Sequence, residues 1–225
     1  MQQRLSKIRV NRIPEEIITL AEILKEAGYA TYSVACNINI SRIQGFDQGF
    51  DRFQRIDYYQ DQTLVNKQLQ AWVDEIRSQK KYFLYIHYMD PHQPYHKREP
   101  WFGRYRQEAR DPLSNLVARY DSEINFVDQK IQQMFQRFGW DKNTLMVITS
   151  DHGEEFKEHG RLGHGKTLYS EVLHVPLMLY HPGGGIPGKV VDTNVSLVDV
   201  APTITSFVGI PADENHMGLD LLALA

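Results

Sequence analysis

Apolar residues along the chain follow two kinds of pattern. Apolar side chains recur every three or four residues in some blocks, as on one face of a helix, and form short β-branched runs in others. The first helical block follows Pro14 and stops at Gly28, residues that suit the start and the end of a helix. The pattern predicts helices at 14–28, 62–78 and 112–138, and strands at 30–35, 82–87, 145–148 and 177–180.

The stretch 145–176 joins an apolar strand to a dense group of polar residues. Its run from Leu145 to Ile148 is typical of a buried parallel strand and stops at Ser150-Asp151-His152-Gly153. Open α/β sheets place their chemistry at such carboxyl ends, where Asp151 and His152 can reach one metal ion. Taken alone, the same letters fit equally well a helix-capping aspartate beside an exposed histidine.

Composition narrows the protein class without selecting a function. The 225 residues are 42% hydrophobic and 24% charged, which suits a globular chain with a substantial core. A formal net charge of −3 gives no electrostatic reason to expect nucleic acid as a partner. One cysteine excludes an intrachain disulfide framework, and no apolar run approaches a membrane span or a signal peptide. The sequence does not indicate the cellular compartment.

The whole string 145–176 resembles the sulfatase family of the alkaline phosphatase superfamily. In that family a Ser-Asp-His/Asn-Gly metal motif is followed by a loop bearing Gly and His, and then by Tyr-x-Glu-x-x-x-Val-Pro-Leu. The matching parts here are Ser150-Asp151-His152-Gly153, His159-Gly160, His164-Gly165, Tyr169-Ser170-Glu171 and Val175-Pro176-Leu177.

Other segments extend the resemblance over residues 14–222. They include Gly45-Phe46-Asp47-Gln48-Gly49-Phe50-Asp51 and the Val195–Ile204 segment. The resemblance implies a single α/β domain over 1–225, with a mostly parallel sheet sandwiched by helices, alkaline-phosphatase/sulfatase-like. It also implies truncation, because the family's N-terminal strand, nucleophile segment and C-terminal subdomain have no counterpart here.

The same resemblance assigns candidate site residues. Asp151 and His152 would be metal ligands for Ca²⁺, Mg²⁺, Mn²⁺ or Zn²⁺, with the imidazole favouring Mn²⁺ or Zn²⁺ over Ca²⁺. His92, in an Asp-Pro-His-x-Pro-Tyr segment, and His164 would bind sulfuryl or phosphoryl oxygens. Lys166 is the alternative to His164, because many sulfatases carry a lysine near this point, although the spacing differs by one. His159 ranks below these as a residue touching the ligand.

Several other polar residues are expected to be structural. Cys36 lacks the Cys/Ser-x-Pro-x-Arg context of a sulfatase nucleophile and should be a small buried residue at a strand end. Glu154 and Glu155 are expected to be solvated loop residues. The carboxylates of Asp121, Glu123 and Asp128 are expected on a solvated helix face, and Asp199 as a cap or buried anchor.

The expected function is metal-dependent hydrolysis of sulfate esters, incomplete in this chain. Without a hydroxyl nucleophile beside the metal, the chain alone should be inactive as a sulfatase. The alternatives are a phosphodiesterase, phosphonate hydrolase or phosphoglycerol-type transferase of the same superfamily, and a non-catalytic anion-binding or structural fragment. Self-association is expected through the sheet edge left by the missing strand.

Overall fold

The computed structural model describes residues 12–57, 63–105, 111–183, 186, 188–211 and 217–224. These residues form two compact units, each described by itself. Unit 1 contains residues up to Pro94 together with Val127–Lys130, and unit 2 contains Tyr95–Phe126 and the residues from Ile131 onward. The expectation of a single domain stays a prediction.

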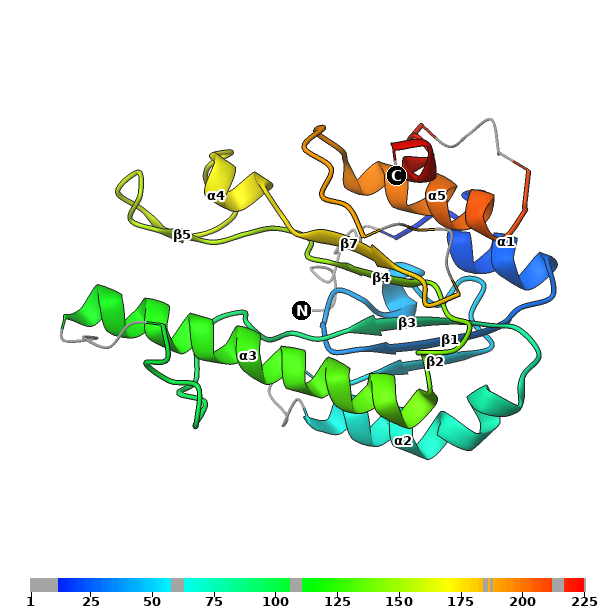
Figure 1. Cartoon of the computed structure of the whole chain (residues 1–225), viewed down its shortest axis with the longest axis horizontal. Coiled ribbons are helices and arrows are strands. Elements are labelled where there is room, and N and C mark those ends of the chain that lie inside the picture. Colours follow the sequence, from blue (N-terminus) through cyan, green and yellow to red (C-terminus); the bar gives the residue numbers. More distant parts are fainter. Residues whose placement is uncertain are drawn as a thin grey trace, which may run out of the picture. The chain divides into compact units, whose positions relative to one another are not determined.

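Unit 1 is a parallel sheet with helices packed on its central strand. Strand β1 lies between β2 and β3, parallel to both, with Ala35 opposite Arg55 on one side and His87 on the other (Figure 1). Both faces of β1 are covered, because consecutive side chains point to opposite faces and those from Thr31 to Ala35 are all buried. The elements of unit 1 are α1 (Leu20–Glu26), β1 (Ala30–Ala35), the 3₁₀ helix η1 (Arg42–Gln44), β2 (Arg52–Arg55), α2 (Thr63–Ser78) and β3 (Tyr82–His87).

Helix α1 begins later than the sequence predicts. The turn that follows Pro14 precedes the helix, which starts at Leu20 after an N-cap at Thr19. Thr19 and Glu22 form a capping box, in which Oγ1 of Thr19 accepts from the Glu22 N–H and the Glu22 carboxylate accepts from the Thr19 N–H. This reciprocal capping, rather than the proline, fixes the start of the helix.

Unit 2 contains a two-stranded antiparallel sheet, and four of the five predicted site residues, all except His92, belong to this unit. Strand β4 pairs with β7, with Thr149 opposite Leu177. The expectation of a buried parallel strand is wrong for β4, whose described partner is antiparallel and whose residues are half-buried or exposed. The elements of unit 2 are α3 (Pro112–Phe138, residues 127–130 excepted), β4 (Met146–Thr149), β5 (Glu155–Phe156), β6 (Leu162–Gly163), α4 (Ser170–Leu173), β7 (Leu177–Tyr180), η2 (Leu197–Asp199), α5 (Val200–Phe207) and η3 (Leu221–Leu224).

Helix α3 has the bounds that its apolar stripe predicts. The Asp111 carboxylate caps its start by accepting from the Leu113 and Ser114 N–H groups, and Gly139 ends it in the left-handed region at φ +69°. The expected solvated acidic face is wrong at Glu123. That side chain is 1% exposed, lies 3.4 Å from the Arg98 guanidinium and accepts from the His96 N–H.

The carboxyl-terminal helices are anchored by one buried carboxylate. Oδ1 of Asp199 accepts from the Leu219 N–H at 2.8 Å, and Oδ2 accepts from the Ser196 N–H at 2.7 Å. Asp199 is therefore the buried anchor that the sequence predicts. The fold class is confirmed as α/β, with a parallel sheet and packed helices. No helix among the described residues combines the length and apolar character needed to cross a bilayer.

Candidate active site

Asp151 and His152 follow directly from the end of β4. The strand ends at Thr149, whose hydroxyl donates to the Pro176 carbonyl at 2.8 Å. Ser150 then donates its hydroxyl to the His152 carbonyl at 2.6 Å, which holds the turn that fans out the next two side chains. The Asp151 side chain is 72% exposed and that of His152 is 34% exposed, so both are accessible to a solvent-borne ion.

The hydrogen bonds of His152 determine which ring nitrogen carries the proton. Nδ1 lies 2.8 Å from the Gly153 carbonyl, which can only accept, so Nδ1 is protonated. Nε2 of the neutral ring then keeps its lone pair and lies 3.8 Å from Oδ1 of Asp151. A cation at the usual ligand distance of ~2.0–2.2 Å from each atom could lie between Nε2 of His152 and Oδ1 of Asp151. Asp151 and His152 therefore fit as two ligands of one divalent cation. The described residues contain no group of three such ligands.

Gly153 is required because the backbone of another segment approaches it closely. Its N–H donates to the Val172 carbonyl at 2.7 Å, which ties the β4 turn to α4. A Cβ at this position would lie 2.1 Å from the Glu171 carbonyl oxygen, too close for any side chain. The glycine of the motif thus serves packing, and it fixes the turn that carries Asp151 and His152.

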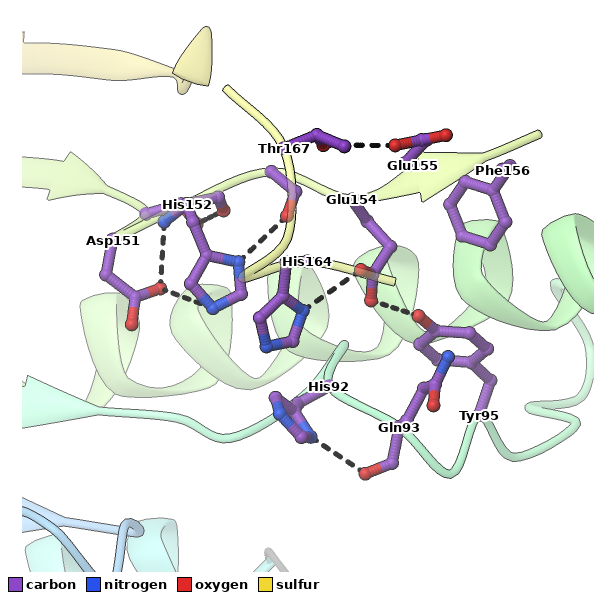
Figure 2. A network of polar contacts seen from close by, with 12 residues as sticks. His92, Gln93, Tyr95, Asp151, His152, Glu154, Glu155, Phe156, His164 and Thr167 are labelled. Atoms are coloured by element: carbon purple, nitrogen blue, oxygen red, sulfur yellow. Dashed lines mark hydrogen bonds and ion pairs between the residues drawn. The ribbon is translucent and has the colours of Figure 1, made fainter. Parts of the chain in front are cut away.

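His164 lies against His152, although twelve positions separate them in sequence. The two rings stack with centroids 3.9 Å apart and an interplanar angle of 28° (Figure 2). Nδ1 of His164 lies 3.0 Å from Oε1 of Glu154. Unit 2 thus brings one predicted anion-binding residue beside the two predicted metal ligands.

The expectation that Glu154 and Glu155 are solvated is wrong. Glu154 is 9% exposed, and its second oxygen accepts from the buried Tyr95 hydroxyl (Figure 2). Glu155 is 1% exposed and accepts from the Arg161 N–H and the Thr167 hydroxyl, which closes the loop between β5 and β6. One sequence signal could have found Glu154. In an extended segment, side chains two residues apart point to the same face, so the Glu154 side chain is expected on the same side as that of His152.

His159 has a partner of its own in unit 2. Its Nδ1 lies 2.5 Å from Oε1 of Glu171, and its ring stacks on Tyr169 with centroids 3.6 Å apart. The pKa of Glu171 is lowered, first by a hydrogen bond from its own backbone N–H and then by His159. These contacts assign His159 to the loop's anchoring on α4.

The remaining candidates are placed as follows. His92 belongs to unit 1, in the segment after β3, where its Nδ1 donates to the Gln93 carbonyl at 2.8 Å. Lys166 is an exposed residue of unit 2, just after Gly165. Cys36 is fully buried after β1, as expected, and burial followed by the charges of Asp90 and Asp57 raises its pKa to about 11. It is protonated and inaccessible.

Two curated relatives match more than half of this chain. The low-salt glycan biosynthesis sulfotransferase Agl7 of Haloferax volcanii is 35% identical over 150 residues, which cover 61% of this chain and 36% of that protein. An arylsulfatase of Clostridium perfringens is 24% identical over 225 residues, covering 83% of this chain and 44% of that protein. The chain spans less than half the length of either relative.

Solved structures show the fold. A 2-O GAG sulfatase superposes with a TM-score of 0.70 at 17% identity, over 95% of this chain and 57% of that one. A putative sulfatase from Bacteroides thetaiotaomicron and an alkaline phosphatase superfamily protein from Vibrio parahaemolyticus have similar folds, with TM-scores of 0.68 and 0.64. The sulfatase family model matches residues 2–210, nearly the whole sequence, and the chain therefore belongs to the sulfatase family.

Proposed function

We propose that this chain is the part of a divalent-metal-dependent sulfate ester hydrolase that binds the metal and the sulfuryl group. Asp151 and His152 would be metal ligands, and His164 would bind a substrate oxygen. Membership of the sulfatase family supports this class of chemistry. The name of the arylsulfatase relative supports a sulfate ester as the substrate class.

The observation that carries the proposal is the arrangement at the end of β4. Nε2 of His152 and Oδ1 of Asp151 are 3.8 Å apart, and the His164 ring stacks on His152 at 3.9 Å. An anion bound at a cation held by Asp151 and His152 would therefore lie within reach of a third side chain. His164 is 28% exposed at its side chain, open enough to meet a ligand.

The donor set suits a range of cations. A carboxylate oxygen serves Mg²⁺, Ca²⁺ or Mn²⁺, and one imidazole nitrogen shifts the preference toward Mn²⁺ or Zn²⁺. A cation bound there would offset the negative charge on the sulfuryl oxygens. The protein's own contribution is orientation, because the Gly153 carbonyl fixes the tautomer of His152 and the Ser150 hydroxyl fixes the turn.

The anion-binding residues act as hydrogen-bond donors in this proposal. Nδ1 of His164 faces Glu154, so His164 would donate to a sulfuryl oxygen through Nε2 when both ring nitrogens carry a proton. His92, whose Nδ1 donates to the Gln93 carbonyl, is assigned to anion binding by the family resemblance alone. Lys166 ranks second to His164, because its spacing differs by one from that of the lysine found in many sulfatases.

Metal titration tests the proposal. Mn²⁺ and Zn²⁺ are titrated calorimetrically into the wild-type chain and into Asp151→Ala, His152→Ala and Glu158→Gln. Glu158 is an exposed carboxylate of the same loop and serves as the control. Loss of a ligand should weaken binding at least about tenfold, while the control should stay close to wild type. Equal affinities in all four proteins would refute the metal site.

A second candidate, transfer of the sulfuryl group to an alcohol, is favoured by one relative. Agl7 is described as a sulfotransferase, and it is the more similar of the two relatives in sequence. The same metal and anion-binding residues would serve both reactions, which differ in whether water or an alcohol accepts the group. Incubation with an aryl sulfate, with and without an alcohol acceptor, separates them by product. An aryl phosphate run in parallel tests the phosphoryl alternative.

A further inference from the structure

We propose that Glu154, held by Tyr95, is a positioning residue that fixes the ring of His164. The inference rests on the proposed role of His164 as a ligand of the substrate anion and deepens it. Neither residue needs to touch the substrate, because both would act through the orientation of the imidazole.

Both oxygens of the Glu154 carboxylate are committed to different partners. Oε1 lies 3.0 Å from Nδ1 of His164, and Oε2 accepts from the hydroxyl of Tyr95 (Figure 2). Tyr95 comes from the segment before α3, 59 positions away in sequence. A carboxylate held at both ends cannot swing, so it presents a fixed acceptor to the histidine.

Aromatic side chains shelter this carboxylate from water. The Tyr95 ring is 6% exposed and meets Tyr120 edge-on at 5.4 Å, and Phe156 packs against Tyr120 at 5.0 Å. A buried carboxylate costs free energy unless it is hydrogen-bonded, and its hydrogen bonds strengthen where water is excluded. The pKa of Tyr120 is raised, chiefly by burial and then by the negative charge of Glu154.

The consequence for His164 is a defined ring orientation. With Nδ1 donating to Glu154, the ring is held so that Nε2 lies on its other side, and Nε2 can donate to an anion when it also carries a proton. The stack on His152 restricts the same ring from its flat side. Without the carboxylate the imidazole could rotate or exchange tautomers. Ordering the ring on binding would then cost free energy and weaken the affinity for the anion.

The test compares variants of the full chain by two measurements. The ring nitrogens of His164 are observed by ¹⁵N NMR, and vanadate, a tetrahedral oxyanion, is titrated in the presence of Zn²⁺. The variants are Glu154→Ala, Glu154→Gln, Tyr95→Phe, His164→Ala and the double variant Glu154→Ala/His164→Ala. Glu155→Gln is the matched control, because Glu155 is also buried, next to Glu154 in sequence, but bonds to Arg161 and Thr167 instead.

Wild-type His164 should show a protonated Nδ1, and Glu154→Ala should show a mixture of tautomers. Vanadate should bind about tenfold more weakly in Glu154→Ala, with a smaller loss in Tyr95→Phe, while Glu155→Gln stays within about twofold. Residues that act as a unit are not additive, so the double variant should bind like His164→Ala. Glu154→Gln keeps an oxygen acceptor and should recover part of the loss.

The outcomes separate this inference from the proposed function. If His164→Ala leaves vanadate binding unchanged, the role of His164 in the proposed function is wrong. If His164→Ala weakens binding but Glu154→Ala does not, only the positioning role is overturned. A wild-type ring protonated at Nε2 alone would also overturn it, and this result needs no vanadate binding. Should Glu154→Ala fail to fold, Glu154→Gln and Tyr95→Phe report on the same contact.

Discussion

Nδ1 of His159 lies 2.5 Å from Oε1 of Glu171, and the contact joins the loop between β5 and β6 to helix α4. Glu171 also lies against Gly153, the glycine that follows the two predicted metal ligands. The loop, the short helix and the β4 turn are thus linked through one glutamate. Disturbing this glutamate should loosen the loop before it affects the rest of unit 2.

Glu171→Gln should increase the mobility of loop residues 157–165. The substitution removes the charge facing His159 while keeping the side chain's size, so hydrogen exchange of this loop should become faster and that of α3 should not change. Hydrogen–deuterium exchange read by mass spectrometry measures both. Glu158→Gln is the control, because that carboxylate bonds within the loop to the Phe156 N–H. Unchanged exchange in Glu171→Gln would show that the contact does not anchor the loop.

The same contact should depend on pH in one direction. The pKa of Glu171 is lower in the folded chain than its ordinary value of 4.5, owing first to its own backbone N–H and then to His159. A lowered carboxyl pKa adds stability above the unfolded value and loses it as the pH falls through the folded value. Loop exchange, corrected for the intrinsic rate, should therefore be steady above about pH 5 and rise below 4.5. In Glu171→Gln this acid-induced rise should be reduced.

Gly153→Ala should destabilise unit 2 by about 1–3 kcal/mol, the usual cost of forcing a methyl group into a packed position. The added Cβ would meet the Glu171 carbonyl at 2.1 Å, and a backbone atom cannot move aside as a flexible side chain can. Chemical denaturation measures the change. Gly188→Ala is the control, because a Cβ there meets nothing within 4 Å. Similar losses in both variants would count against the close approach.

Glu123→Ala should cost on the order of 3 kcal/mol, because it leaves the partly buried Arg98 guanidinium without this carboxylate. It also removes the acceptor of the His96 N–H. Asp128→Asn, at an exposed position of the same helix, should change the free energy of unfolding by less than about 0.5 kcal/mol. Thermal and urea unfolding of the two variants give the comparison. A Glu123 variant as stable as wild type would place that side chain on the surface.

Cys36 should not react with a thiol reagent in the native chain. Its side chain is fully buried, and a pKa of about 11 leaves about one thiolate in a thousand at pH 8. A disulfide reagent such as DTNB should therefore label it only after denaturation, with one equivalent released. Rapid native labelling would mean that the thiol is accessible and would reopen a chemical role for it.

The sequence by itself predicted the main helices and strands and the position of the Asp151-His152 motif. Apolar periodicity predicted helix α3 and strand β3 with their observed bounds, because these periods follow from backbone geometry that each segment carries locally. Asp151 and His152 follow β4 directly in the chain, so knowing where the strand ends suffices to place them. The start of α1 was missed because the capping box of Thr19 and Glu22 outweighs the earlier proline.

Only the tertiary structure decided which charged residues are buried. Spacing along the chain gives Glu154 and Glu155 the appearance of solvated loop residues, and Glu123 that of a helix-surface residue. A carboxylate is buried where partners compensate its desolvation, and the partner of Glu154 is Tyr95, 59 positions away. The stack of His164 on His152 likewise depends on how the loop folds back. Local patterns cannot encode such pairings, because they arise from packing between segments that are distant in sequence.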